Sequence, residues 1–154
     1  MKLDLQDIEI ICSDILENDK FNKMKYEIHH GISRYEHVIR VAKATYKILN
    51  DINSPNLVSA TRAALLHDFY LNSDLSEESE VFKKHPSIAL INAKKYFKID
   101  ELQEDIIKNH MFPATKQIPK HFESNLVSLV DKGVSLYEIL CYKLKYLLLK
   151  RLYD

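Results

Sequence analysis

The chain has 154 residues, a length that fits one compact domain with its own hydrophobic core. Hydrophobic residues make up 46% of it, which argues against a disordered chain, and only two glycines and four prolines are present, which argues against a turn-rich all-β protein. Its 22 basic and 22 acidic residues balance, so the composition gives no general attraction to nucleic acids or membranes, and any anion site must be local.

The spacing of apolar residues predicts helices along nearly the whole chain. A stripe of isoleucines and leucines predicts the first helix over residues 4–17. Ser33 and Glu36 match a capping box and predict a helix from there to about residue 49. Ser54 as N-cap, followed by Pro55, predicts the next helix, which ends near residue 68.

The second half of the chain also contains residues that are typical of helix starts and helix ends. Pro86 predicts a helix start and Asp100 caps the helix after it, which runs to about residue 111. Gly133 predicts the end of a short helix over 125–132. Ser135 and Glu138 match a second capping box that opens the C-terminal helix. We therefore expect one all-α domain over residues 1–154, with about six or seven helices, a core of about 30–135 and a C-terminal helix of about 135–153.

The predicted C-terminal helix is apolar on two faces. Such a helix fits either a well-buried closing helix or a helix that also packs against a partner chain, so a homodimer through this helix is one expectation. The residues on the two faces are Leu136, Ile139, Leu140, Leu144, Leu147 and Leu148, and Tyr142, Tyr146, Leu149 and Tyr153.

Histidines and acids recur at predicted helix ends and on apolar faces. Neutral imidazole offers one lone pair and a carboxylate offers two oxygens, and together they suit divalent metals such as Mn, Fe, Co, Ni or Zn without thiolate. A bound cation would also offset the cost of burying the aspartate of "AALLHDFYL" (63–71). The candidate donors are His37, His67, Asp68, His85, His110 and Asp131.

The segments that carry these residues resemble the HD-domain metal-dependent phosphohydrolase superfamily. "SRYEHVIRVA" resembles the segment of its first histidine, "AALLHDF" its name-giving pair and "LVDKG" its last aspartate. "KHPSIAL" and "IIKNHMFP" resemble the two extra histidine segments of the binuclear subset. The resemblance covers roughly residues 30–135. No Gly-Tyr-Pro follows His110, which argues against the cyclic-dinucleotide phosphodiesterases that carry that signature.

The resemblance implies a site with two divalent ions, Fe or Mn before Zn, Ni, Co or Mg. One ion would take His37, His67, Asp68 and Asp131, and the other Asp68, His85 and His110. It also implies hydrolysis of a phosphate ester or anhydride by hydroxide that the metals activate, with His67 and Asp68 at the catalytic centre. The expected substrate is a small nucleotide.

Positive side chains near these donors are the candidates to bind phosphate. Arg34 lies one helical turn before His37, and its guanidinium fork matches phosphate geometry. Lys132 follows Asp131, and Lys116 lies in the loop after His110. We expect catalytic roles for Arg34 and Lys132 and substrate contacts from all three, with His29 and His30 as candidates for the general acid.

Two other classes of function stay open at this stage. One is a metal- or nucleotide-binding protein without turnover, and the other is a di-iron oxygenase with a similar order of ligands. The two cysteines lie in apolar helical runs and fit reduced thiols. With no leader-like or membrane-length apolar run, we expect a cytoplasmic protein without membrane or nucleic-acid partners.

Overall fold

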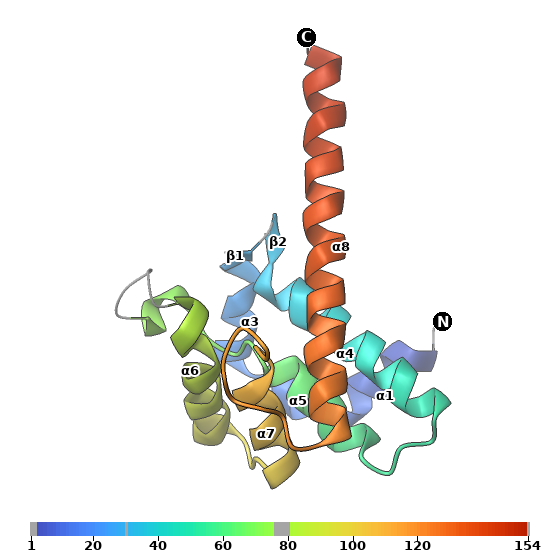
Figure 1. Ribbon diagram of the computed structural model, residues 1–154, viewed down its shortest axis with the longest axis vertical. Coiled ribbons are helices and arrows are strands. Elements are labelled where there is room, and N and C mark those ends of the chain that lie inside the picture. Colours follow the sequence, from blue (N-terminus) through green and yellow to red (C-terminus); the bar gives the residue numbers. More distant parts are fainter. Residues whose placement is uncertain (1–2, 30, 76–80, 154) are drawn as a thin grey trace.

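The computed structural model describes residues 3–29, 31–75 and 81–153. Within them, the fold consists of eight α-helices and one pair of two-residue strands at the edge of the helical body (Figure 1), which confirms the all-α class. There are more helices than the six or seven expected, partly because the first predicted helix is divided at Cys12. The elements are α1 (Leu3–Ile11), α2 (Ser13–Leu16), α3 (Asp19–Lys23), η1 (Met24–Tyr26), β1 (Ile28–His29), β2 (Ile32–Ser33), α4 (Arg34–Asp51), α5 (Leu57–Leu66), η2 (Asn72–Asp74), α6 (Val81–Tyr96), α7 (Glu101–Asn109) and α8 (Phe122–Tyr153).

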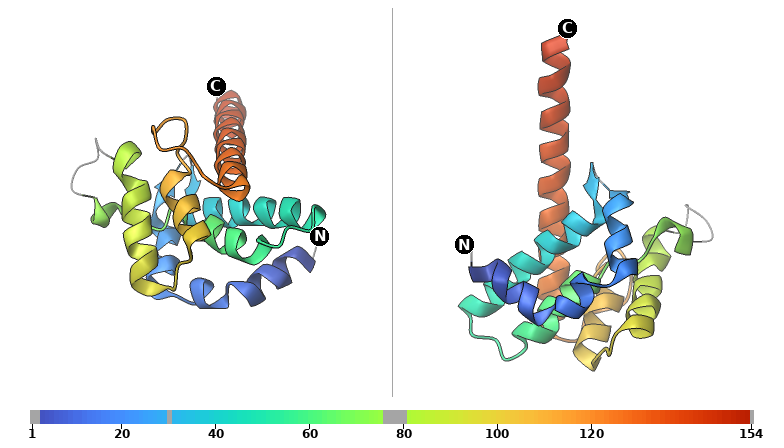
Figure 2. Two further views of the ribbon diagram at one scale, coloured as in Figure 1. Left: turned by 60° about the horizontal axis from the view of Figure 1, so that its bottom comes forward. Right: turned by 180° about the vertical axis from the view of Figure 1, so that it is seen from behind.

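Helix α5 lies at the centre of the helical body (Figure 2). It packs against α4 and α7 and also contacts α8, α1 and α6. Ala60, Ala63 and Ala64 are fully buried, and their small side chains let neighbouring helices approach closely. Leu65 and Leu66 are also fully buried, so the residues that follow α5 emerge in the middle of the body.

Two predicted caps are confirmed at atomic detail. The Ser33 hydroxyl accepts from the Glu36 N–H at 3.2 Å, and the Glu36 carboxylate accepts from the Ser33 N–H at 3.1 Å. Asp100 and Gln103 form the same reciprocal pair at the start of α7. The first cap fixes where α4 begins and so sets the depth of its first turn in the body.

Two predicted helix starts are wrong. Ser54 does not cap α5, because the helix begins only at Leu57. The Ser54 hydroxyl instead accepts a hydrogen bond from the Asn56 N–H and donates one to Glu123. Pro86 does not open a helix either, because α6 begins at Val81 and carries the proline inside. In both cases tertiary packing overrides the local signal. At Pro86 the helix continues although proline has no N–H to donate.

The prediction of a break near Gly133 is also wrong. Helix α8 runs for 32 residues through this position, so the C-terminal helix expected from residue 135 is its second half. Ser135 donates to the Asp131 carboxylate one turn earlier, at 3.5 Å, and caps nothing. Glu138 is buried and bonds to α4 instead of the backbone. These contacts hold one face of α8 to the body across the glycine.

A short β-hairpin that the sequence analysis did not predict precedes α4. Ile28 pairs with Ser33 and His29 with Ile32 in antiparallel register. Gly31 has a φ of 85°, and a Cβ there would overlap the Tyr142 ring of α8. The hairpin therefore packs closely against α8 only because position 31 lacks a side chain.

Among the residues that the structure describes, no helix combines the length and apolar character needed to cross a membrane.

The two glycines give opposite predictions for stability. Gly133→Ala should stabilise the protein by about 0.5–1 kcal/mol, because the position is helical and open space surrounds it. Gly31→Ala, the matched control, should destabilise it through the clash with Tyr142. Chemical denaturation of both variants measures this. A destabilised Gly133→Ala would mean that the glycine ends a helix, as the sequence alone suggested.

Candidate metal centre

Six buried side chains converge inside the body. They come from the first turn of α4, the end of α5, α6, the end of α7, and α8. None is more than 8% exposed. They are the six residues predicted as metal ligands: His37, His67, Asp68, His85, His110 and Asp131.

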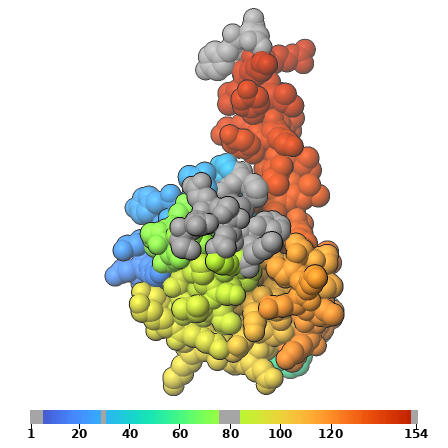
Figure 3. Space-filling view, turned by 60° about the vertical axis from the view of Figure 1, so that its left-hand side comes forward, coloured from blue at the N-terminus to red at the C-terminus, as the bar shows by residue number. Residues whose placement is uncertain are grey.

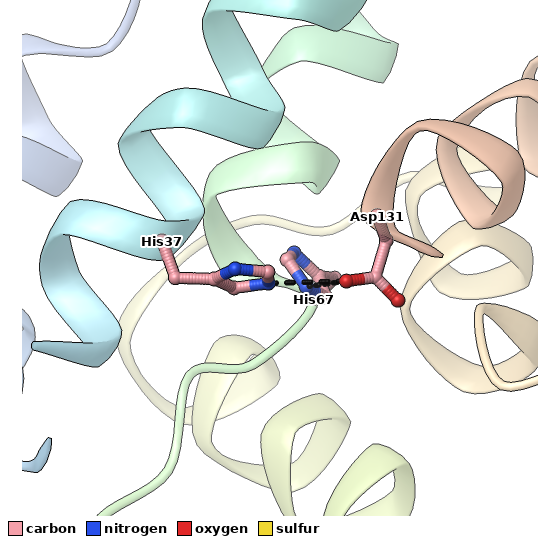
Figure 4. Close-up of side chains that lie close together, drawn as sticks. All are labelled: His37, His67 and Asp131. Atoms are coloured by element: carbon pink, nitrogen blue, oxygen red, sulfur yellow. Dashed lines mark hydrogen bonds and ion pairs between the residues drawn. The ribbon is translucent and has the colours of Figure 1, made fainter. Parts of the chain in front are cut away.

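The first group joins α4, the end of α5 and α8 (Figure 4). One oxygen of Asp131 lies 3.0 Å from Nε2 of His37 and 3.6 Å from Nε2 of His67. The donor atoms of the three residues all lie within 4.8 Å of one another. The two imidazoles therefore point at one carboxylate from different helices, as ligands around one ion would.

The second group lies on the other side of Asp68. One oxygen of this aspartate lies 3.3 Å from Nε2 of His85 and 3.5 Å from Nε2 of His110, and these two nitrogens are 3.0 Å apart. Its other oxygen lies 3.9 Å from Nε2 of His67. Asp68 thus faces imidazoles with both oxygens and links the two groups.

Hydrogen bonds behind the rings fix how two histidines face the site. Nδ1 of His67 lies 2.7 Å from the Ala64 carbonyl oxygen, and Nδ1 of His110 lies 2.8 Å from the Ile107 carbonyl oxygen. A carbonyl only accepts, so Nδ1 carries the proton in each ring. In the neutral rings the Nε2 lone pair then points into the site, which is the form that binds metals.

Two inward atoms have no hydrogen-bond partner although they are buried. They are Nε2 of His67 and one oxygen of Asp68. Such atoms normally find a partner, since an unsatisfied buried polar group costs about 1–3 kcal/mol. The mixed imidazole and carboxylate donors, without thiolate, suit a borderline or hard divalent ion. The residues therefore fit a metal on both geometry and chemistry.

The charges in the site favour a cation. Burial opposes a charge on His37, but hydrogen bonds with Asp131 and Glu138 outweigh it and raise its pKa to about 10. Burial would also raise the pKa of Asp68 and Asp131, yet the neighbouring imidazoles hold both well below the usual range. Without a metal, protons on the histidines supply the positive charge that the carboxylates require.

Glu138 is a functional residue that the sequence analysis missed. Its side chain is fully buried, and one oxygen accepts from Nδ1 of His37 at 2.9 Å. The other oxygen accepts from Arg40 at 3.1 Å. Glu138 lies seven residues after Asp131, two turns along the same face of α8. That spacing reveals the role only if α8 is known to continue through Gly133.

Two residues predicted to bind phosphate, Lys132 and Arg34, make hydrogen bonds to backbone groups beside the site. Lys132 donates to the His110 carbonyl at 2.9 Å and to Ser128, so its ammonium supports the end of α7. Arg34 is buried, donates to the Tyr70 carbonyl at 2.9 Å and stacks on the Tyr70 ring at 3.8 Å. The Tyr70 ring in turn contacts the His85 ring.

The structure describes the side chain of only one of the three remaining candidates, Lys116. Lys116 is exposed in the connection between α7 and α8. The backbone of His29 belongs to β1, and His30 falls outside the described residues. None of the three gains a catalytic role from the geometry described here.

Comparison with known proteins gives one match. A family model for the HD domain matches residues 34–136, about two thirds of the chain, and this range contains all six converging side chains. No curated protein and no solved structure shows significant similarity to the chain.

Glu138→Ala should weaken metal binding by about 10- to 100-fold, because it removes the acceptor that orients His37. Glu138→Gln, which keeps an oxygen in place, should lose less. Competition with a metal-sensing chelator measures both affinities. Glu123→Ala is the control: this glutamate is also buried on α8 but bonds to Ser54 and Asn56, so its loss should lower stability and leave the affinity unchanged. Equal losses at positions 138 and 123 would contradict the role of Glu138.

Metal binding should release protons. Ligands must bind as neutral imidazoles, and His37 and His67 both have raised pKa values in the metal-free protein. Below those values, the apparent affinity should fall about tenfold per pH unit for each proton displaced. Titration calorimetry in buffers of different ionisation enthalpy measures the number of protons. Heats that do not depend on the buffer would show that the histidines are already neutral.

Proposed function

The chain belongs to the HD-domain family, part of a superfamily of metal-dependent phosphohydrolases, and we propose that it hydrolyses a phosphate ester or anhydride of a small nucleotide. The observation that carries the proposal is the position of Asp68. Both of its oxygens face imidazoles, and one of them is buried without a hydrogen-bond partner. This is the environment of a carboxylate that bridges two ions.

We propose two ions, Fe or Mn, held by residues that share Asp68. The second group supports this number, because His85 and His110 bring nitrogens to one Asp68 oxygen while His67 approaches the other. A single ion bound by the first group would leave these two buried imidazoles without a ligand role. The ligands would be His37, His67, Asp68 and Asp131 for one ion, and Asp68, His85 and His110 for the other.

The ions, when bound, would act as Lewis acids that activate water near neutral pH and offset the charge that grows on phosphoryl oxygens. The protein's own part is to keep Asp68 and Asp131 ionised and to hold the imidazoles in a fixed orientation. Hydrogen bonds from Nδ1 do this for His67 and His110. Site preorganisation of this kind removes a reorganisation cost during the reaction.

Arg34 and Lys116 remain the proposed contacts for the outer phosphate oxygens. Nε of Arg34 is buried without a hydrogen-bond partner, so this N–H is available for one acceptor. Its other contacts, with the Tyr70 ring, Glu27 and Asn72, would hold the guanidinium in place. Lys116 is exposed and free to reach a substrate as a point charge. Lys132 is not retained as a phosphate contact, since its ammonium supports His110.

Asp68→Asn should lower kcat/KM by roughly a thousandfold or more, about 4 kcal/mol, because it removes the shared carboxylate. The assay uses protein loaded with Mn or Fe, and p-nitrophenyl phosphates, nucleotides and dinucleoside polyphosphates as substrates. Asp105→Asn is the matched control, since Asp105 is equally buried but holds the backbone before α8 and Ser124. It should leave kcat/KM within about threefold.

The same assay separates the alternatives. A hydrolase forms its product without consuming oxygen, whereas a di-iron oxygenase requires it. Metal-loaded protein that cleaves none of these substrates and still binds one of them would indicate a binding protein. Product formation that requires oxygen, or binding without cleavage, would contradict the proposed function.

A further inference from the structure

The second half of α8 extends beyond the helical body, and its Tyr142 ring packs against Gly31 of the hairpin. Figures 1 and 2 show it extending away from the helical body, and Figure 3 shows it as a column above the rest of the surface. Every residue from 140 to 151 is exposed. We call residues 140–153 the projecting segment. The segment continues a helix that is already packed in the body, so a partner would add stability by covering its apolar residues.

One side of this helix carries a continuous row of leucines. Their spacing of four, four, three and one residues keeps them within about 120° of helix surface. Their exposed fractions lie between 56% and 61%, far from those of core leucines such as Leu65. We call this row the leucine seam: Leu136, Leu140, Leu144, Leu147 and Leu148.

The seam supplies more than half of the area that a stable protein interface buries on each partner. Five leucines at this exposure present on the order of 500 Å² of apolar area, more than a scattering of surface residues does. A stable interface buries about 800 Å² per partner. The stems of the flanking basic side chains and a contact between the helix tip and a partner's body would supply the remainder.

Charge indicates which partner fits. The projecting segment up to residue 153 carries Lys143, Lys145, Lys150 and Arg151 and no acid. Residues 1–139 contain 18 basic and 21 acidic residues, a net charge of −3, and the remaining acid, Asp154, follows the projecting segment. A second copy of this chain therefore offers both an identical seam and a body of opposite charge.

We propose that two copies pair through the leucine seam with their α8 helices antiparallel. This arrangement places the basic tip of each helix beside the acidic body of the other copy and closes with two-fold symmetry. Parallel packing would instead place Lys143 and Lys150 opposite their own copies. The proposal is independent of the proposed function.

A membrane surface is a poorer partner for this helix. A helix that lies on a bilayer separates its polar and apolar faces. Lys143 and Lys145 are two residues apart and so project on nearly opposite sides, with apolar residues between the basic ones all round. An all-round apolar helix is typical of enclosure by protein.

The first test is the mass of the full chain by sedimentation at about 10–100 µM, where an interface of standard size is occupied. The wild type should have twice the chain mass of 18.1 kDa. Leu140→Glu combined with Leu147→Glu should halve it. Each new glutamate has a basic residue three or four positions away, so the helix itself is retained, which circular dichroism checks. Ile91→Glu, at a position 66% exposed on α6, is the control and should stay dimeric.

The second test measures helix direction with spin labels. Cys12 is buried and Cys141 is exposed, so Cys141 accepts a label near the middle of the seam. In an antiparallel pair the two labels at 141 lie close together, whereas labels on Lys150→Cys in a Cys141→Ser background lie about 20–25 Å apart along the helix axis. Short distances at both positions would contradict the antiparallel arrangement.

A wild-type monomer at these concentrations, or a dimer that the double glutamate variant leaves intact, would overturn the proposal. A monomer that sediments with vesicles of phosphatidylcholine and phosphatidylserine would overturn it in favour of a lipid surface.

Discussion

The structure depends on placing two carboxylates, Asp68 and Asp131, inside a helical body. Buried carboxylates are costly unless positive charge lies beside them. Here His37 and His67, whose pKa values are raised, supply it, and His85 and His110 also lie close to Asp68. This requirement explains why α4, α6, α7 and α8 each direct one donor towards the end of α5. It also explains why the same side chains can bind protons in the metal-free protein and divalent ions in the metal-bound protein.

Some of these donors could be predicted from correct local signals, although the signals beside His85 and Asp131, Pro86 and Gly133, were misleading. His37 follows the Ser33 capping box by one turn, and Asp68 ends an apolar run. The capping geometry and the all-α class followed from the same signals. What could not be predicted depends on residues far apart in the chain. Glu138 matches a capping box locally, yet its bond to His37 spans 101 positions.

Gly133 shows why the local signal failed. A glycine inside a helix costs about 1 kcal/mol relative to alanine, which favours a break. On either side of it, Asp131 bonds to His37 and Glu138 bonds to His37 and Arg40, all on one face of α8. These contacts outweigh the cost and keep the helix continuous. Helix α8 is therefore one continuous helix that carries both Asp131 of the candidate metal centre and the projecting segment.

The most direct test of the central claim is a crystal structure with anomalous diffraction at the absorption edge of Mn or Fe. Two peaks per chain are expected beside Asp68, one near His37, His67 and Asp131 and the other near His85 and His110. A single peak would leave the second group without a metal role. The absence of any peak among these six side chains, in protein supplied with both metals, would contradict the claim that the fold is built around a metal centre.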